Sequence, residues 1–229
     1  MLQLDGVRLS RGNFTLRADL QFPKGARVAL MGASGSGKST FLSLLAGFIW
    51  PDAGRVQMAG QDTTQARAAD RPLSILFQDG NLFPHLNVFD NVALGIRPNL
   101  KLHHEDQARV AGALEQVGLS AMAQRRPADL SGGQQSRVAL ARILLRDKPI
   151  TLLDEPFTAL DPGLRREMLG LVRAFCEETG QTLIMATHDL RDAERLCDHV
   201  VLLEEGSVVL DAPLEAAIAG QSPALLPWL

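Results

Sequence analysis

A glycine-rich stretch near residue 35 has the residue types and the spacing of a phosphate-binding loop. It fits the pattern G-x-x-x-x-G-K-[ST] between an apolar run and a helix-like run, and it comprises Gly32, Ala33, Ser34, Gly35, Ser36, Gly37, Lys38, Ser39 and Thr40. Glycines allow the backbone N–H groups of such a loop to point inward at a phosphate chain. Lys38 adds a positive charge, and Ser39 has the hydroxyl expected to bind Mg²⁺.

Two alternative roles for this stretch fit less well. An ordinary surface turn does not require Lys-Ser after its last glycine. A dinucleotide-binding turn would require a small, glycine-like residue at the position of Thr40. The stretch therefore predicts binding of a phosphate chain.

Two adjacent carboxylates, Asp154 and Glu155, directly follow the apolar run at residues 150–153. Phosphoryl transfer depends on metal binding, positioning and charge stabilisation more than on covalent chemistry. One carboxylate of such a pair can hold Mg²⁺ through water while the next faces the attacking water. In a chain that already has a phosphate-binding loop, the pair favours nucleotide hydrolysis over a solvated acidic surface.

A second anion-binding element follows Leu130. The start of a predicted helix is formed there by Ser131, Gly132, Gly133 and Gln134. Such a start presents N–H groups, a hydroxyl and the positive end of the helix dipole to an anion. One nucleotide rarely needs two such elements from a single copy of a chain.

Alternating strands and helices must position these groups. Antiparallel strands are expected within residues 2–22, and buried strands at residues 26–31, 73–77, 150–153 and 182–186. Helices dominate between residues 79 and 146. We expect an α/β fold of P-loop NTPase type, with a mainly parallel sheet, an N-terminal antiparallel β unit and an inserted helical lobe. One domain, 1–229, would comprise a core lobe (1–78 and 147–229) and the helical lobe (79–146).

Composition excludes several classes of protein. The net charge of −3 gives no broad electrostatic surface for nucleic acid, so no nucleic-acid partner is expected. The start of the chain lacks the basic and apolar regions of a signal peptide, and no apolar stretch is long enough to cross a bilayer. Cys176 and Cys197 lie outside any Cys-x-x-Cys motif, which indicates a reducing, cytosolic compartment.

Three motifs in this order resemble the ATP-binding subunits of ABC transporters over nearly the whole chain: the loop at 32–40, Leu-Ser-Gly-Gly-Gln at 130–134 and Leu-Leu-Asp-Glu-Pro at 152–156. The resemblance implies ATP as the nucleotide, with Mg²⁺. It also implies that two copies pack head to tail. Ser131 and Gly133 of one copy would then close over the ATP held by the other.

The same resemblance assigns roles to four further residues. Glu155 corresponds to the general base and His188 to the switch histidine near the γ-phosphate. Gln78 corresponds to the residue that contacts Mg²⁺ together with Ser39 and Asp154, and Asp161 lies in the dimer-contact loop. These family positions make Lys38, Gln78, Glu155 and His188 the candidate catalytic residues.

The residue that stacks on adenine is left open. The family usually has an aromatic ring near the end of the first strand, whereas this chain has Arg11 there, with Phe14 just beyond a turn. A planar guanidinium can stack as a ring does, so either residue could serve.

Among ABC proteins, a chain of this length without a membrane segment, a second nucleotide domain or a coiled coil resembles the ATPases of bacterial importers. Residues 71–78, 81–86 and 98–102 are most similar to those of thiamine importers, which implies import of thiamine or its phosphate esters. The resemblance further implies a peripheral position on the cytoplasmic face of the inner membrane. An integral permease would be a direct partner and a periplasmic substrate-binding protein an indirect one.

The permease is expected to dock near Phe83, Leu86, Val88 and Phe89, although internal packing of these residues is an equal alternative. Three other functions also stay open. They are import of another small solute (iron, polyamine, sulfate or molybdate), a non-transport ABC switch that clamps a protein or nucleic acid, and a monomeric small-molecule kinase. The kinase leaves the stretch at 130–134 without a role.

Overall fold

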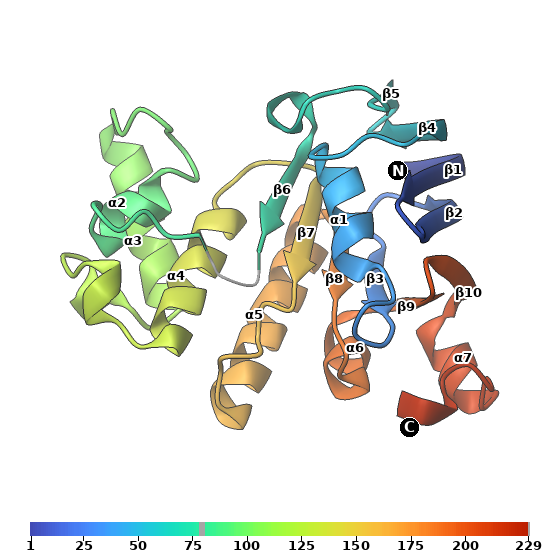
Figure 1. The fold of residues 1–229 in the computed structure, drawn as a ribbon. Coiled ribbons are helices and arrows are strands. Elements are labelled where there is room, and N and C mark those ends of the chain that lie inside the picture. Colours follow the sequence, from blue (N-terminus) through green and yellow to red (C-terminus); the bar gives the residue numbers. More distant parts are fainter. Residues whose placement is uncertain (78–80, 229) are drawn as a thin grey trace.

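The computed structural model describes residues 1–77 and 81–228 of the chain. Its strands are β1 (Leu2–Arg11), β2 (Phe14–Phe22), β3 (Arg27–Met31), β4 (Ala53–Met58), β5 (Gln61–Asp62), β6 (Leu73–Leu76), β7 (Ile150–Asp154), β8 (Thr182–Ala186), β9 (His199–Glu204) and β10 (Ser207–Pro213). Within the described residues these strands form one 10-stranded sheet in the order β5-β4-β1-β2-β10-β9-β3-β8-β7-β6 (Figure 1). The expected antiparallel unit is formed by β1 and β2, and β4 extends it by pairing antiparallel with β1.

The parallel strands bring the phosphate-binding loop and the acidic pair to one edge of the sheet. β3 lies between β8 and β9, and β7 lies between β6 and β8, with all of these pairs parallel. Parallel strands are buried on both faces, which explains why their sequences are continuous apolar runs. Because their carboxyl ends share an edge, the loops that follow β3, β7 and β8 meet there.

Helices cover both faces of these strands. On β3, Val28 and Leu30 belong to a core cluster with α1 (Lys38–Ala46) and the antiparallel unit. The alternate residues Ala29 and Met31 belong to a second cluster with α5 (Pro162–Thr179) and α6 (Leu190–Leu196). This alternation is the period of two expected for a strand. It fixes α1, and hence the loop before it, against a rigid support.

The helical lobe lies beside the sheet (Figure 1) and contains α2 (Val88–Ala93), α3 (His104–Gln116) and α4 (Gly132–Leu144). Its buried side chains, such as Val92 and Leu140, belong to the same core cluster as Met185 of β8. The lobe is thus packed onto the sheet through a continuous apolar core. The division at residues 79 and 146 stays a prediction.

The last part of the chain contains two elements that the sequence pattern did not indicate. These are α7 (Leu214–Ala219) and a 3₁₀ turn at Leu226–Trp228. Leu225 is fully buried, so the turn is held against the domain. In the described part of the chain, no helix combines the length and the apolar character that crossing a bilayer requires.

Candidate active site

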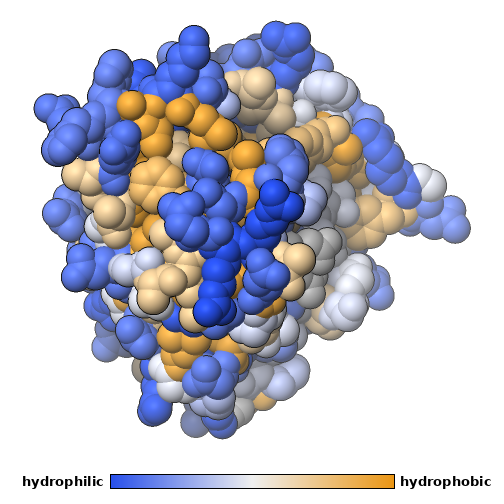
Figure 2. Space-filling model, turned by 90° about the vertical axis from the view of Figure 1, so that its left-hand side faces the viewer, coloured by the Kyte–Doolittle hydropathy of each residue, from blue (hydrophilic) through white to orange (hydrophobic). Residues whose placement is uncertain are grey.

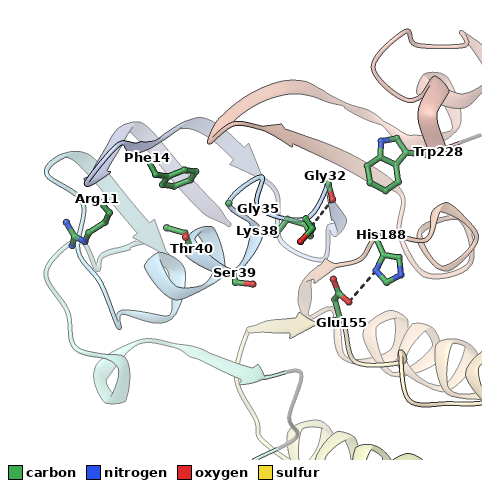
Figure 3. A pocket seen from close by; sticks show the side chains of 12 residues that line it. Arg11, Phe14, Gly32, Gly35, Lys38, Ser39, Thr40, Glu155, His188 and Trp228 are labelled. Carbon is green, nitrogen blue, oxygen red and sulfur yellow. Dashed lines mark hydrogen bonds and ion pairs between the residues drawn. The ribbon is translucent and has the colours of Figure 1, made fainter.

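A cleft of about 810 Å³ opens at the carboxyl edge of the parallel strands (Figure 3). It brings together the phosphate-binding loop, the acid after β7 and the histidine after β8. Its walls are formed by Arg11, Phe14, Gly32, Ser34, Gly35, Gly37, Lys38, Ser39, Thr40, Glu155, His188 and Trp228. Most of the predicted site residues therefore lie in one place.

Glycine is required at both ends of the loop between β3 and α1. Gly32 has φ +150°, and a Cβ there would lie 2.4 Å from the carbonyl oxygen of Leu203. Gly37 has φ +109°, and a Cβ there would lie 2.6 Å from the Phe14 ring. The loop can therefore keep its conformation only with glycine at these positions.

Lys38 is turned back onto the loop and is only 8% exposed. Its Nζ donates hydrogen bonds to the carbonyl oxygens of Gly32 and Ala33, at 2.7 and 3.0 Å. Burial lowers the pKa of Lys38, and the nearby Glu155 and Asp154 carboxylates partly oppose this. An ammonium has three donors, and within residues 1–77 and 81–228 these are its two hydrogen bonds, so a third donor is available to an anion in the cleft.

The loop carries further polar groups that fit a phosphate. The Ser36 hydroxyl is buried without a hydrogen-bond partner among the described residues. The first N–H groups of α1, beginning at Lys38, have no intrahelical acceptor, and the positive end of the helix dipole faces the same side. Buried donors without acceptors are costly, so this environment favours an anionic ligand.

Ser39, in the wall of the cleft, makes a side-chain hydrogen bond with Asp154 at the end of β7. Burial raises the pKa of the Asp154 carboxyl, and the hydrogen bond from Ser39 works against that rise. A hydroxyl and a carboxylate are oxygen ligands of the kind Mg²⁺ prefers. No cluster of three or more His, Cys, Asp or Glu side chains suited to a metal occurs among residues 1–77 and 81–228. The two oxygens fit Mg²⁺ only as part of a set completed by phosphate and water.

Glu155 has a strained backbone. Its φ is +47°, a region that costs a non-glycine residue about 1–3 kcal/mol. Its N–H donates to the carbonyl oxygen of Ala186 at 3.1 Å, so β8 holds this conformation. The result is that Glu155 Oε2 lies 3.3 Å from His188 Nδ1 (Figure 3).

The second anion-binding element lies outside the cleft of its own copy. Ser131 is the N-cap of α4: its Oγ accepts a hydrogen bond from the Gln134 N–H at 3.3 Å, and Gln134 Oε1 accepts one from the Ser131 N–H at 2.9 Å. Neither these residues nor Gly132 and Gly133 line the cleft. A Cβ on Gly133 would lie 3.3 Å from the carbonyl oxygen of Ala159, so the element adjoins the loop at 159–161 instead.

The loop at 159–161 ends in Asp161, which caps α5. Its Oδ1 accepts hydrogen bonds from the N–H groups of Gly163 and Leu164 at 3.1 and 3.0 Å. Asp161 does not line the cleft either. Gln78 lies outside the described residues, so its predicted contact with Mg²⁺ stays a prediction.

Both candidates for stacking on the base lie in the cleft. The Phe14 ring packs on Gly37, whereas Arg11 is exposed and pairs loosely with Asp52, with Nη1 and Oδ1 3.9 Å apart. Sequence reasoning missed Trp228, which lines the opposite side of the cleft. No spacing or motif marks this residue, because only tertiary packing brings the 3₁₀ turn to the site.

The predicted docking surface is partly wrong. Val88 is 0% exposed, because the first turn of α2 buries it in the core of the helical lobe. Phe89 is partly buried against the same core, and its N–H donates to the carbonyl oxygen of Ala123. Phe83 is 45% exposed and Leu86 is half-buried, so these two residues remain candidates.

Comparison with known proteins agrees with this geometry. The sequence pattern of the family described as "ABC transporter" matches residues 16–158. The thiamine import ATP-binding protein ThiQ of Jannaschia sp. (strain CCS1) is 72% identical over 229 residues, which are 100% of each chain.

Two solved structures are also similar. The ATP-binding cassette MJ0796, in a dimeric post-hydrolysis state bound to ADP and Pi, has a TM-score of 0.82 at 31% identity, covering 93% of this chain and 99% of that one. cbiO1 from Clostridium perfringens, part of the ABC transporter complex cbiONQ, has a TM-score of 0.84 at 29% identity, covering 97% and 92%. With the family pattern over more than half of its length and a relative matched from end to end, the chain belongs to the ABC transporter family as an ATP-binding subunit.

Proposed function

We propose that this chain hydrolyses ATP to power a bacterial importer of thiamine or its phosphate esters. The observation that carries the proposal is that each copy has two anion-binding elements that do not meet, the cleft at Lys38 and the helix start at Ser131. Two copies packed head to tail would complete two ATP sites. Support for thiamine comes from the relative named a thiamine import ATP-binding protein, which is 72% identical over the full length.

ATP binding uses the groups at the start of α1. The triphosphate accepts a hydrogen bond from the remaining donor of the Lys38 ammonium and further ones from the first N–H groups of α1. Ser39 and Asp154, with Gln78, would hold Mg²⁺, which neutralises charge on the phosphates. The base lies at the end of the cleft formed by Arg11 and Phe14.

Hydrolysis uses the acid after β7. Glu155 accepts a proton from the attacking water. His188 Nδ1 lies 3.3 Å from the Glu155 carboxylate and orients that carboxylate toward the terminal phosphate. The strained backbone at Glu155 serves this role, because it fixes the carboxylate at the mouth of the cleft. The second copy contributes Ser131 and Gly133, whose N–H and hydroxyl groups stabilise charge on that phosphate.

A permease docks on the apolar residues that flank the segment 78–80. Phe48 is 49% exposed and packs on Phe77, with ring centroids 5.6 Å apart, while Phe83 follows the segment. Figure 2 shows hydrophobic patches between hydrophilic residues on the side that carries the helical lobe. Docking there places the subunit on the cytoplasmic face of the inner membrane, with a periplasmic binding protein delivering the solute from the opposite side.

The test is reconstitution of the chain with its permease and binding protein in vesicles. Uptake of labelled thiamine that depends on ATP, and that is lost in the matched Glu155→Gln complex, is the expected result. Uptake of a different solute under the same conditions would overturn the assignment to thiamine. Normal hydrolysis by the Glu155→Gln complex would overturn the assigned base.

A further inference from the structure

Trp228 is held at the cleft by an anchored turn. Leu225 is fully buried, and its carbonyl oxygen accepts a hydrogen bond from the Trp228 N–H at 2.8 Å. The indole itself is partly buried against the core that contains α5 and α6. Its position is therefore set by packing rather than by chance placement of a tail.

The indole lies at the end of the cleft opposite the base-binding residues. Figure 3 shows Arg11 and Phe14 at one end, Lys38 in the middle, and His188 with Trp228 at the other end. His188 and Trp228 also form the common wall to a second hollow of about 530 Å³ over α6. A nucleotide with its base near Phe14 and its phosphates on the loop directs its terminal phosphate toward this end.

The indole offers an unused donor. Trp228 Nε1 makes no side-chain hydrogen bond within residues 1–77 and 81–228. Indole nitrogen can only donate, and Nε1 is absent from the buried atoms without a partner, so it is open to the solvent of the cleft and accessible to a ligand there. No described residue of the cleft accepts a hydrogen bond from the Trp228 indole N–H, whereas a phosphate oxygen of a bound nucleotide could accept one.

We propose that Trp228 is a nucleotide-contacting residue that donates its indole N–H to the terminal phosphate, and so favours ATP over ADP. The inference rests on the proposed function and adds a residue to its site. A hydrogen bond to a charged acceptor contributes enough to change affinity by about tenfold or more. ADP lacks the terminal phosphate, so loss of this hydrogen bond should leave the affinity for ADP unchanged.

The experiment measures ATP and ADP affinity by calorimetry on the full chain with Mg²⁺. A Glu155→Gln background prevents hydrolysis, and light scattering confirms that the chain is monomeric at the concentration used. Trp228→Phe keeps a ring and removes the donor, so it should weaken ATP binding about tenfold and leave ADP binding unchanged. Phe14→Leu is the matched control at the other end of the cleft, and it should weaken both nucleotides alike.

A fluorescence measurement tests the same contact without weakening it. The chain has two tryptophans, so Trp50→Phe leaves Trp228 as the sole indole. Its emission should change more with ATP than with ADP, whereas the Trp228→Phe chain, which reports Trp50, should respond little to either.

Each outcome decides the matter. Equal effects of Trp228→Phe on both nucleotides, or no effect on either, would overturn the contact with the terminal phosphate. If the parent chain bound neither nucleotide, the proposed function would fall along with this inference.

Discussion

The proposed head-to-tail dimer predicts that two inactive variants restore activity when mixed. Lys38→Ala removes the ammonium from the cleft, and Ser131→Asp replaces a proposed hydrogen-bond donor to the phosphate with a carboxylate. Aspartate is as good a helix N-cap as serine, so the hydrogen bond from the Gln134 N–H and the start of α4 are retained. A loss of activity in Ser131→Asp thus reports on the phosphate and not on the helix.

The sizes of the effects follow from charge. A carboxylate about 4 Å from a phosphate, at an effective dielectric constant of about 20, is repelled by about 4 kcal/mol, or roughly 10³-fold. Either variant alone should therefore be nearly inactive. In a mixed dimer, the cleft of the Ser131→Asp copy meets the intact Ser131 of the Lys38→Ala copy, so one site is complete and the other has both lesions.

Random association of equal amounts makes half of the dimers mixed, each with one intact site of two. ATP hydrolysis should then recover to about one quarter of the unmodified rate, measured by phosphate release after mixing. The control mixes Ser131→Asp with the double variant Lys38→Ala, Glu155→Gln. ATP hydrolysis in this mixture should recover to the same level, because Glu155→Gln falls in a cleft that Lys38→Ala has already inactivated. A mixture no more active than the separate variants would refute the shared site.

Three further predictions concern single residues. Glu155→Gln should lower ATP hydrolysis by about 10²- to 10⁴-fold while ATP binding, measured by calorimetry, is retained. Arg71→Met should lower the free energy of unfolding, measured in urea, by about 3 kcal/mol. The reason is that the Arg71 side chain is only 1% exposed and its guanidinium donates hydrogen bonds to three carbonyl oxygens, those of Leu44, Leu45 and Ala66, at 2.7, 2.7 and 3.1 Å. The control Arg67→Met removes only an exposed pair with Asp70 and should change it by about 0–1 kcal/mol. Asp154→Asn should raise the urea midpoint of the nucleotide-free chain at neutral pH, since burial raises the pKa of this carboxyl and its ionised form therefore destabilises the folded state. That gain should fade as the pH falls below the carboxyl's raised folded pKa toward its ordinary value of 3.8, and a gain independent of pH would contradict the cause.

Residues close together in the sequence made much of this site predictable. The loop at 32–40 and the pair at 154–155 each follow an apolar strand, and the carboxyl ends of parallel strands must share an edge. His188 could be placed at the same edge because it follows β8. The fold class followed from the same alternation of strands and helices.

Features that depend on packing between distant segments were not predictable. Val88 is apolar, as a docking residue would be, but the packing of α2 on α3 and α4 buries it. Arg71 resembles a surface charge in the sequence, yet it lies against the last carbonyl groups of α1. Trp228 reaches the cleft only because Leu225 anchors its turn. In each case the side chain's own sequence neighbours carry no information about its partner.

The charges in the proposed dimer explain why ATP would join the two copies and hydrolysis would separate them. The start of α1 in one copy and the start of α4 in the other both carry the positive end of a helix dipole. Without an anion between them these ends repel, and the Lys38 ammonium adds to the repulsion. The triphosphate supplies acceptors and negative charge to both sides at once. In the proposed dimer, release of the terminal phosphate would remove that charge from between Lys38 and the other copy's Ser131. The dimer would then open at this step, and the proposed docking surfaces on the two copies would move apart.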